Sequence, residues 1–201
     1  MKKLLLLSGL LGLLILGLAA CEKTAINSNQ TTNDSMENNA NTNSAVVTDA
    51  DKTDSKVADS DDGEFMIKAP QGGMAEVKLG ELAASKAQNA DVKAFGKLMV
   101  TDHSKANDEL KAVAKKKNFT LPTDVNEDQK KAYDELAKLS GKEFDAKYVE
   151  MMVDDHEKDI DLFKKEADDG EDVDVKDFAA KTLPTLNLHY EKIKAIKDKM
   201  K

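Results

Sequence analysis

The sequence predicts an all-α protein, a four-helix bundle with one short additional helix, preceded by a disordered tether. Apolar residues recur at helical spacing through the long segments after residue 63. No segment alternates apolar and polar residues with the period of two that a half-buried strand would show. Residues 22–62 contain no aromatic residue and are rich in Asn, Thr, Ser and Asp, a composition typical of disorder.

Helix boundaries follow from local start and stop signals. Asn89 to Asp91 supplies a break and an N-cap, and Asp168-Asp169-Gly170 ends the helix expected over 142–169. Pro70, followed by Gly72-Gly73, is expected to weaken the opening turns of the first helix, and Pro184 to kink the last. We expect helices over 64–88, 91–117, 127–139, 142–169 and 174–200, with a loop over 118–126.

The first twenty residues have the features of a secretory signal peptide. Two lysines precede an apolar run that ends at Leu18-Ala19-Ala20-Cys21. That run is shorter than the ~20 residues that span a bilayer, which disfavours a transmembrane anchor. The ending resembles the lipobox of bacterial lipoproteins, which implies cleavage before Cys21, a diacylglycerol on its sulfur and a further acyl chain on its amino group. We therefore expect an exported protein, lipid-anchored to the outer or inner membrane, with its domain in the periplasm or at the surface.

Composition excludes several function classes. The chain has 30 Lys+Arg, all of them Lys, against 38 Asp+Glu, for a net charge of −8, which argues against a nucleic-acid partner. A single Cys excludes an internal disulfide and a four-thiolate metal site. Much of the acidity falls in residues 21–62, so we divide the chain into a signal peptide (1–20), a lipidated tether (21–62) and a bundle domain (63–201).

The three histidines are the most informative residues. His103, His156 and His189 each lie on an apolar stripe near the middle of a different long helix, and Glu76 lies about half-way along the first. Mid-helix residues share one height in a bundle whichever way each helix runs, and an offset of two or three residues is only about 3–5 Å. We therefore expect these four side chains to converge. Three imidazoles and one carboxylate suit a single divalent transition ion such as Zn, Fe or Mn.

A metal-free polar network is the alternative, because imidazoles can also satisfy a buried glutamate by hydrogen bonding. Asn107 and Asp159, three or four residues after a histidine on the same helix, are candidates for a supporting role. Asp102 and Asp155 directly precede a histidine and point about 100° away from it. They could orient a ligand on an adjoining helix or pair with lysines.

The stretch from Met74 to about Ile196 resembles the bacterial envelope proteins that carry domain of unknown function 4142. The matching segments are Glu76-Val77-Lys78-Leu79-Gly80, Val92-Lys93-Ala94-Phe95, Met99-Val100-Thr101-Asp102-His103, Ser140-Gly141 with Phe144-Asp145 and Tyr148, His156, and Thr182-Leu183-Pro184 with His189. The resemblance implies a ferritin-like bundle on an exported protein. Ferritin-like di-iron proteins carry Glu three residues before His. Here Val100, Val153 and Leu186 stand at those positions, so we expect no di-iron centre.

These observations favour a non-enzymatic, metal-binding or stress-related envelope lipoprotein. The alternative is a structural or interaction module that binds an unknown envelope protein or polymer and whose His/Glu cluster is a polar core. The sequence has no Ser or Cys nucleophile motif, glycine-rich phosphate loop or His-Glu-x-x-His, so catalysis ranks third. The oligomeric state is not indicated by the sequence.

Overall fold

A computed structural model describes residues 60–201, and this part of the chain is helical with no strand, as predicted. Each helix begins and ends within three residues of its expected bounds. The helices are α2 (Asp61–Lys86), α3 (Ala90–Lys117), α4 (Glu127–Lys138), α5 (Gly141–Asp169) and α6 (Val173–Lys199).

Polar residues cap four of these helices. The side chain of Asn89 accepts hydrogen bonds from two backbone N–H groups at the start of α3, and Asp172 does the same for α6. Asn126 and Gln129 form a reciprocal capping box at the start of α4. Ser60 caps α2 by accepting from the N–H of Gly63. These local bonds explain why the boundaries could be predicted from sequence.

The bundle begins earlier than composition suggested. Residues 60–62, which we assigned to the tether, form the cap and first two residues of α2. Asp62 is buried, and its carboxylate accepts hydrogen bonds from the backbone N–H groups of Glu171 and Asp172 at 2.9 and 2.8 Å. The expected signal peptide, the lipidation at Cys21 and the rest of the tether lie outside the described residues.

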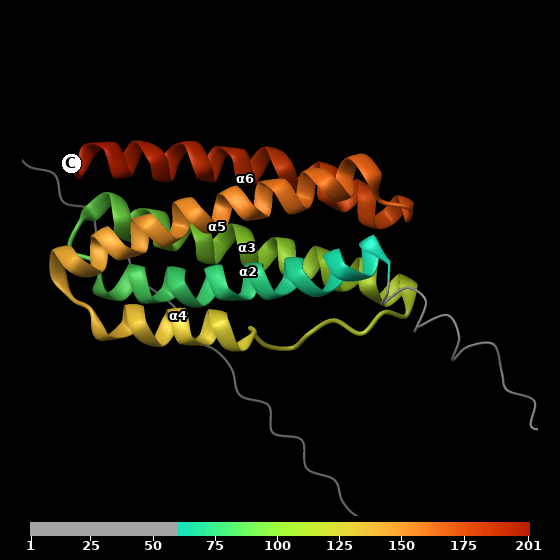
Figure 1. Ribbon diagram of the computed structural model, residues 1–201, viewed down its shortest axis with the longest axis horizontal. Helices are drawn as coiled ribbons and strands as arrows, with labels where there is room; N and C mark the ends of the chain where they lie inside the picture. Colours follow the sequence, from blue (N-terminus) through green and yellow to red (C-terminus); the bar gives the residue numbers. More distant parts are fainter. Residues whose placement is uncertain (1–59) are drawn as a thin grey trace, which may run out of the picture. The chain divides into compact units, whose positions relative to one another are not determined.

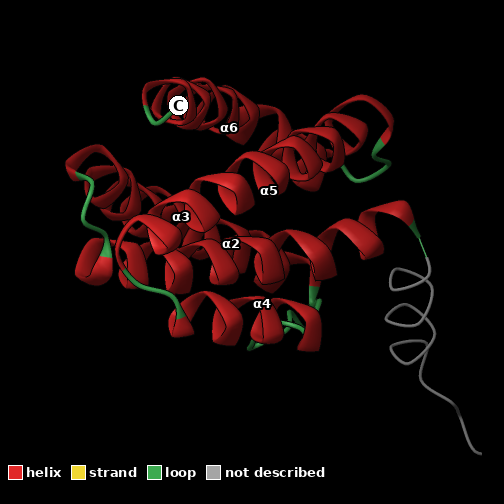
Figure 2. Cartoon of the chain, turned by 60° about the vertical axis from the view of Figure 1, so that its left-hand side comes forward, coloured by secondary structure: helices red, strands yellow, loops and turns green. Residues whose placement is uncertain are grey.

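The four long helices form an antiparallel bundle with one crossover (Figures 1 and 2). Helix α2 packs against α3 and α5, and α6 packs against α5 and α3. After α3 the chain returns along the bundle through residues 118–126 and α4, so α5 starts at the same end as α3. One long crossover of this kind is the connectivity of ferritin-like bundles. Helix α4 lies against α2 and α5.

Glycines bring two helices into close contact. A Cβ at Gly80 of α2 would lie 2.6 Å from the carbonyl oxygen of Gly96 of α3, so the two backbones touch there. Helix α2 runs unbroken from Asp61 through Pro70. A Cβ at Gly73 would collide with Oδ1 of Asn107, so the small residue makes room for a side chain of α3.

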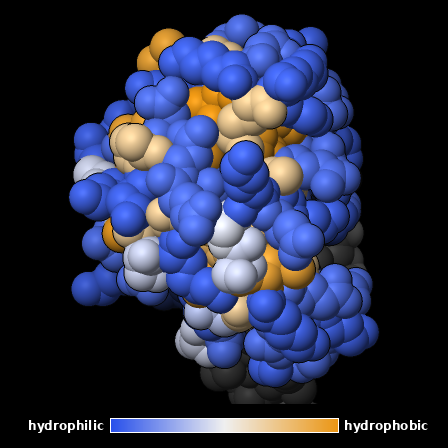
Figure 3. Space-filling model, turned by 90° about the vertical axis from the view of Figure 1, so that its left-hand side faces the viewer, coloured by the Kyte–Doolittle hydropathy of each residue, from blue (hydrophilic) through white to orange (hydrophobic). Residues whose placement is uncertain are grey.

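A polar layer divides the interior of the bundle into two apolar halves. One half is built around Phe95, Phe144 and Met152, and the other around Phe65 and Phe163. The three histidines and the glutamate lie between these halves along their helices. Figure 3 shows the end of the bundle at which α6 ends, where apolar surface is visible between hydrophilic side chains. Within residues 60–201 no helix is both long and apolar enough to span a membrane.

Candidate metal centre

The structure brings the three histidines together from three helices. The ring centroids of His103 (α3), His156 (α5) and His189 (α6) are 5.4 to 5.8 Å apart, and each side chain is buried. One nitrogen from each ring can be chosen so that all three lie within 4.8 Å of one another. When three imidazoles bind the same ion at metal–nitrogen distances of 2.0–2.1 Å, their ring centroids are about 5.2–5.5 Å apart. The rings are therefore spaced almost as they would be around a single ion.

Each ring contacts a neighbouring group through one nitrogen. His156 Nδ1 lies 2.8 Å from the carbonyl oxygen of Met152, and His189 Nε2 lies 2.8 Å from Oδ2 of Asp102. His103 Nδ1 lies 2.8 Å from Oε2 of Glu76. Because these partners are acceptors, they favour the tautomers that carry the proton on the contacted nitrogen.

The other nitrogen of each ring is buried and has no hydrogen-bond partner among the described residues. These atoms are His103 Nε2, His156 Nε2 and His189 Nδ1. In the tautomers that the contacts favour, each carries a free lone pair. A histidine metal ligand has this arrangement, with one nitrogen on the ion and the other held by an acceptor.

The electrostatics keep the rings neutral. Burial lowers the pKa of all three histidines, and lowers that of His103 to about 4. The Asp102 hydrogen bond partly offsets this effect on the pKa of His189. Neutral imidazole is the form that binds a metal ion.

Glu76 belongs to the centre, but it does not join the cluster of nitrogens. Its carboxylate contacts Nδ1 of His103 at 2.8 Å and Nδ1 of His156 at 3.2 Å. Those nitrogens are on the opposite side of each ring from the free ones. We expected Glu76 to bind the ion as a fourth ligand together with the three rings. The structure places its carboxylate against the Nδ1 atoms of two of these rings. Burial raises its pKa to about 7, an effect that His156 opposes.

The four expected supporting residues divide into three groups. Asp102 reaches across to His189 on an adjoining helix, one of the two roles considered for it. Asp159 is next to Glu76, and burial, followed by the charge of Glu76, raises the pKa of Asp159 well above its usual value. Asp155 and Asp159 line one cavity together with Glu76. Asn107 lies instead against Gly73 and lines a different cavity, and no contact with a histidine is seen.

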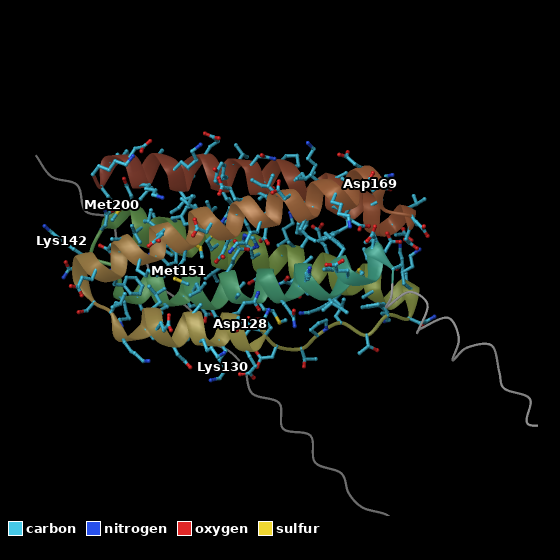
Figure 4. The ribbon with its side chains drawn as sticks, in the orientation of Figure 1. Asp128, Lys130, Lys142, Met151, Asp169 and Met200 are labelled. Carbon is cyan, nitrogen blue, oxygen red and sulfur yellow. The ribbon has the colours of Figure 1, made fainter. Side chains whose placement is uncertain are left out.

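Two features of the centre were not anticipated. The hydroxyl of Tyr148 is buried without a hydrogen-bond partner among the described residues, and burial together with the charge of Glu76 raises its pKa. A tyrosine on an apolar stripe gives no signal for this. The second feature is a cavity of about 380 Å³ between α2, α4 and α5 that reaches Glu76. Asp128 of α4 and Met151 of α5, both labelled in Figure 4, line it.

Comparisons with solved structures find the same fold. A DUF305 fragment from Deinococcus radiodurans superposes with a TM-score of 0.61 at 10% identity, over 69% of this chain and 96% of that one. A DUF305 protein from Streptomyces coelicolor gives 0.60 at 12% identity, over 71% and 95%. CopM in the Cu(II)-bound form gives 0.59 at 14% identity, over 70% and 97%.

A comparison with curated proteins finds no match. A family model, by contrast, matches most of the chain. It is the model of DUF4142, a domain of unknown function, and it covers residues 46–196. This agrees with the resemblance seen in the sequence, and the chain belongs to the DUF4142 family.

Proposed function

We propose that the bundle binds one transition-metal ion through His103 Nε2, His156 Nε2 and His189 Nδ1. The observation that carries the proposal is the set of three buried, unpartnered imidazole nitrogens on rings spaced for a common ion. Asp102 and Glu76 act as the outer partners that orient two of the rings. Three protein ligands leave at least one coordination position open for water or another ligand.

The donor set favours particular ions. With Glu76 on the Nδ1 side of the rings, the protein donors are nitrogen only, and imidazole suits Zn, Cu, Fe and Ni better than Mn. Among these, Cu²⁺ is one first choice because divalent affinities at nitrogen sites reach their maximum at copper, and Zn²⁺ is the other because three histidines with one open position are a known zinc ligand set. CopM, one of the proteins with this fold, is described in a Cu(II)-bound form, which supports testing copper first.

The cell envelope is the proposed location. The signal-like first twenty residues and the lipobox-like ending at Cys21 support export and lipid anchoring, and the acidic tether would separate membrane and bundle. The DUF305 protein from Streptomyces coelicolor is provisionally described as secreted, which agrees with export. We propose binding, as in storage, buffering or a stress response, rather than catalysis.

A metal-free polar core is the second candidate. The observation that favours it is the contact of Glu76 with two imidazoles, which could serve packing alone. This candidate assigns the bundle a structural role or an interaction with another envelope component. It predicts that histidine substitutions change the free energy of unfolding and that this change is the same with and without added metal ions.

Metal analysis separates the two candidates. Residues 22–201 retain every cap and core residue described above, and they should be purified without chelator or affinity metal. We expect elemental analysis and calorimetric titration to give about one ion per chain. A His156→Gln variant should lose affinity by more than the roughly 10–100-fold typical of an outer partner. A folded wild-type protein that binds none of Zn²⁺, Cu²⁺, Fe²⁺ and Mn²⁺ would refute the proposal.

A further inference from the structure

The cavity between α2, α4 and α5 combines access from the surface with a strongly acidic lining. Its volume is about 380 Å³, and α4 contributes one wall through residues that include Ala132. Its ionisable lining residues are five acids, Glu76, Asp128, Asp154, Asp155 and Asp159, and one base, Lys158. An acidic cleft with low-dielectric walls concentrates cations and raises their association rates by about 10–10³.

Other cavities near the histidines have a different charge. A cavity of about 360 Å³ between α3 and α6 includes Phe95, whose ring is 6.0 Å from that of His156, but its charged residues are one aspartate and two lysines. A cavity of about 160 Å³ beside Asp102 has two acids and two lysines. The electrostatic field of the lining residues therefore favours cation entry through the cavity that reaches Glu76 over entry through either of the other two cavities.

Glu76 supplies an independent reason to connect this cavity with a cation. Its side chain is only 2% exposed, and it lines the inner end of the cavity. No N–H group of the described residues donates a hydrogen bond to its carboxylate oxygens, and the neighbouring Asp159 carboxyl is the group that can share a proton with it. The same oxygens lie 2.8 and 3.2 Å from ring nitrogens of His103 and His156. One buried carboxylate thus contacts both the acidic cavity and the imidazole cluster.

We infer that this cavity is the route by which the metal ion reaches the three histidines. The acidic lining attracts the hydrated cation, and Glu76 is the innermost carboxylate on the path, against the rings of His103 and His156. On this path the ion exchanges water for carboxylate oxygens and then carboxylate oxygens for imidazole. The inference rests on the proposed function, and it assigns a kinetic role to residues that the bound ion does not need as ligands.

A steric block tests the route. Ala132 of α4 lines the cavity and is not in the histidine cluster, so Ala132→Phe should narrow the path without altering the ligands. Ala195→Phe is the matched control, because it places the same side chain in the cavity between α3 and α6. Zn²⁺ loading of residues 22–201 is followed by stopped flow against a fluorescent chelator. Equilibrium affinity is measured on the same preparations, and circular dichroism checks the fold.

We expect Ala132→Phe to slow loading and release at least tenfold each, with an unchanged dissociation constant, while Ala195→Phe matches wild type. Loading of Ala132→Phe at the wild-type rate, or slowing by Ala195→Phe instead, would overturn the route. A wild-type protein that takes up no ion would refute the proposed function itself, so the two failures are distinguishable.

A second variant keeps the inference testable if Ala132→Phe does not fold. The Asp155→Asn/Asp159→Asn pair removes two acidic groups from the lining and keeps similar shapes. We expect a slower association rate at low salt, with a weaker dependence on salt concentration than wild type. An association rate and salt dependence equal to those of wild type would overturn the route.

Discussion

The contact between Asp102 and His189 gives the sharpest test of the proposed centre. Oδ2 of Asp102 lies 2.8 Å from Nε2 of His189, so the carboxylate is about 6.5 Å from an ion on Nδ1 across the ring. At an effective dielectric constant of about 40–80, a divalent ion and one carboxylate at that distance attract by about 1.3–2.6 kcal/mol. Asp102→Asn should therefore weaken Zn²⁺ or Cu²⁺ binding about 10–100-fold, the range usual for outer partners of histidine ligands.

The assay is competition with a fluorescent chelator at fixed pH and salt. Asp108→Asn is the matched control, because Asp108 lies on the same helix but is exposed and pairs with Lys111. The side chain of Asp102 is 31% exposed, so the metal-free unfolding midpoint should change little in either variant. Equal metal affinity in the two variants would refute the assignment of Asp102 as an orienting partner.

Three further predictions concern the bundle itself. Gly80→Ala should lower the free energy of unfolding by about 1–3 kcal/mol, because its Cβ would meet the Gly96 carbonyl oxygen at 2.6 Å. A urea titration measures this, and an unchanged midpoint would contradict the close helix contact. Asp145→Ala should cost about 1–3 kcal/mol in the same assay, because the buried Asp145 carboxylate accepts from the N–H groups of Gln88 and Asn89 at 3.1 and 2.7 Å. Burial, with the charge of Asp62, raises the pKa of Glu166 to about 7. Since the folded state favours the protonated form, stability should fall as pH rises from about 4.5 through 7, and Glu166→Gln should reduce this loss by about 1–3 kcal/mol. Unfolding at pH 5 and pH 8 checks the sign, and parallel pH profiles for the two proteins would contradict it.

Local signals explain which parts of the structure could be predicted. Asn89, Asn126 and Gly170 lie at helix ends because their short or absent side chains suit caps and stops, so the boundaries were predicted closely. Convergence of the histidines was also predictable, because helices of similar length place their middles at one height.

The remaining features depend on how the helices are rotated and crossed. Which nitrogen of a ring Glu76 contacts is decided by the side-chain angles of His103 and His156, which spacing does not encode. Asp102 reaches His189 only because α6 packs against α3. The acidic cavity requires α4 to return along α2 and α5, and this position is set by tertiary packing rather than by its own sequence.

The cost of the polar layer itself argues for a cation. A buried imidazole nitrogen left without any partner would cost about 1–3 kcal/mol, and three of them together would offset a sizeable part of a net stability of about 5–15 kcal/mol. Their other nitrogens face acceptors, so the free nitrogens are themselves acceptors. A water molecule can donate only two hydrogen bonds and would leave one of the three unpaired. A single metal ion can accept three such lone pairs at once, which is the arrangement that the proposed centre requires.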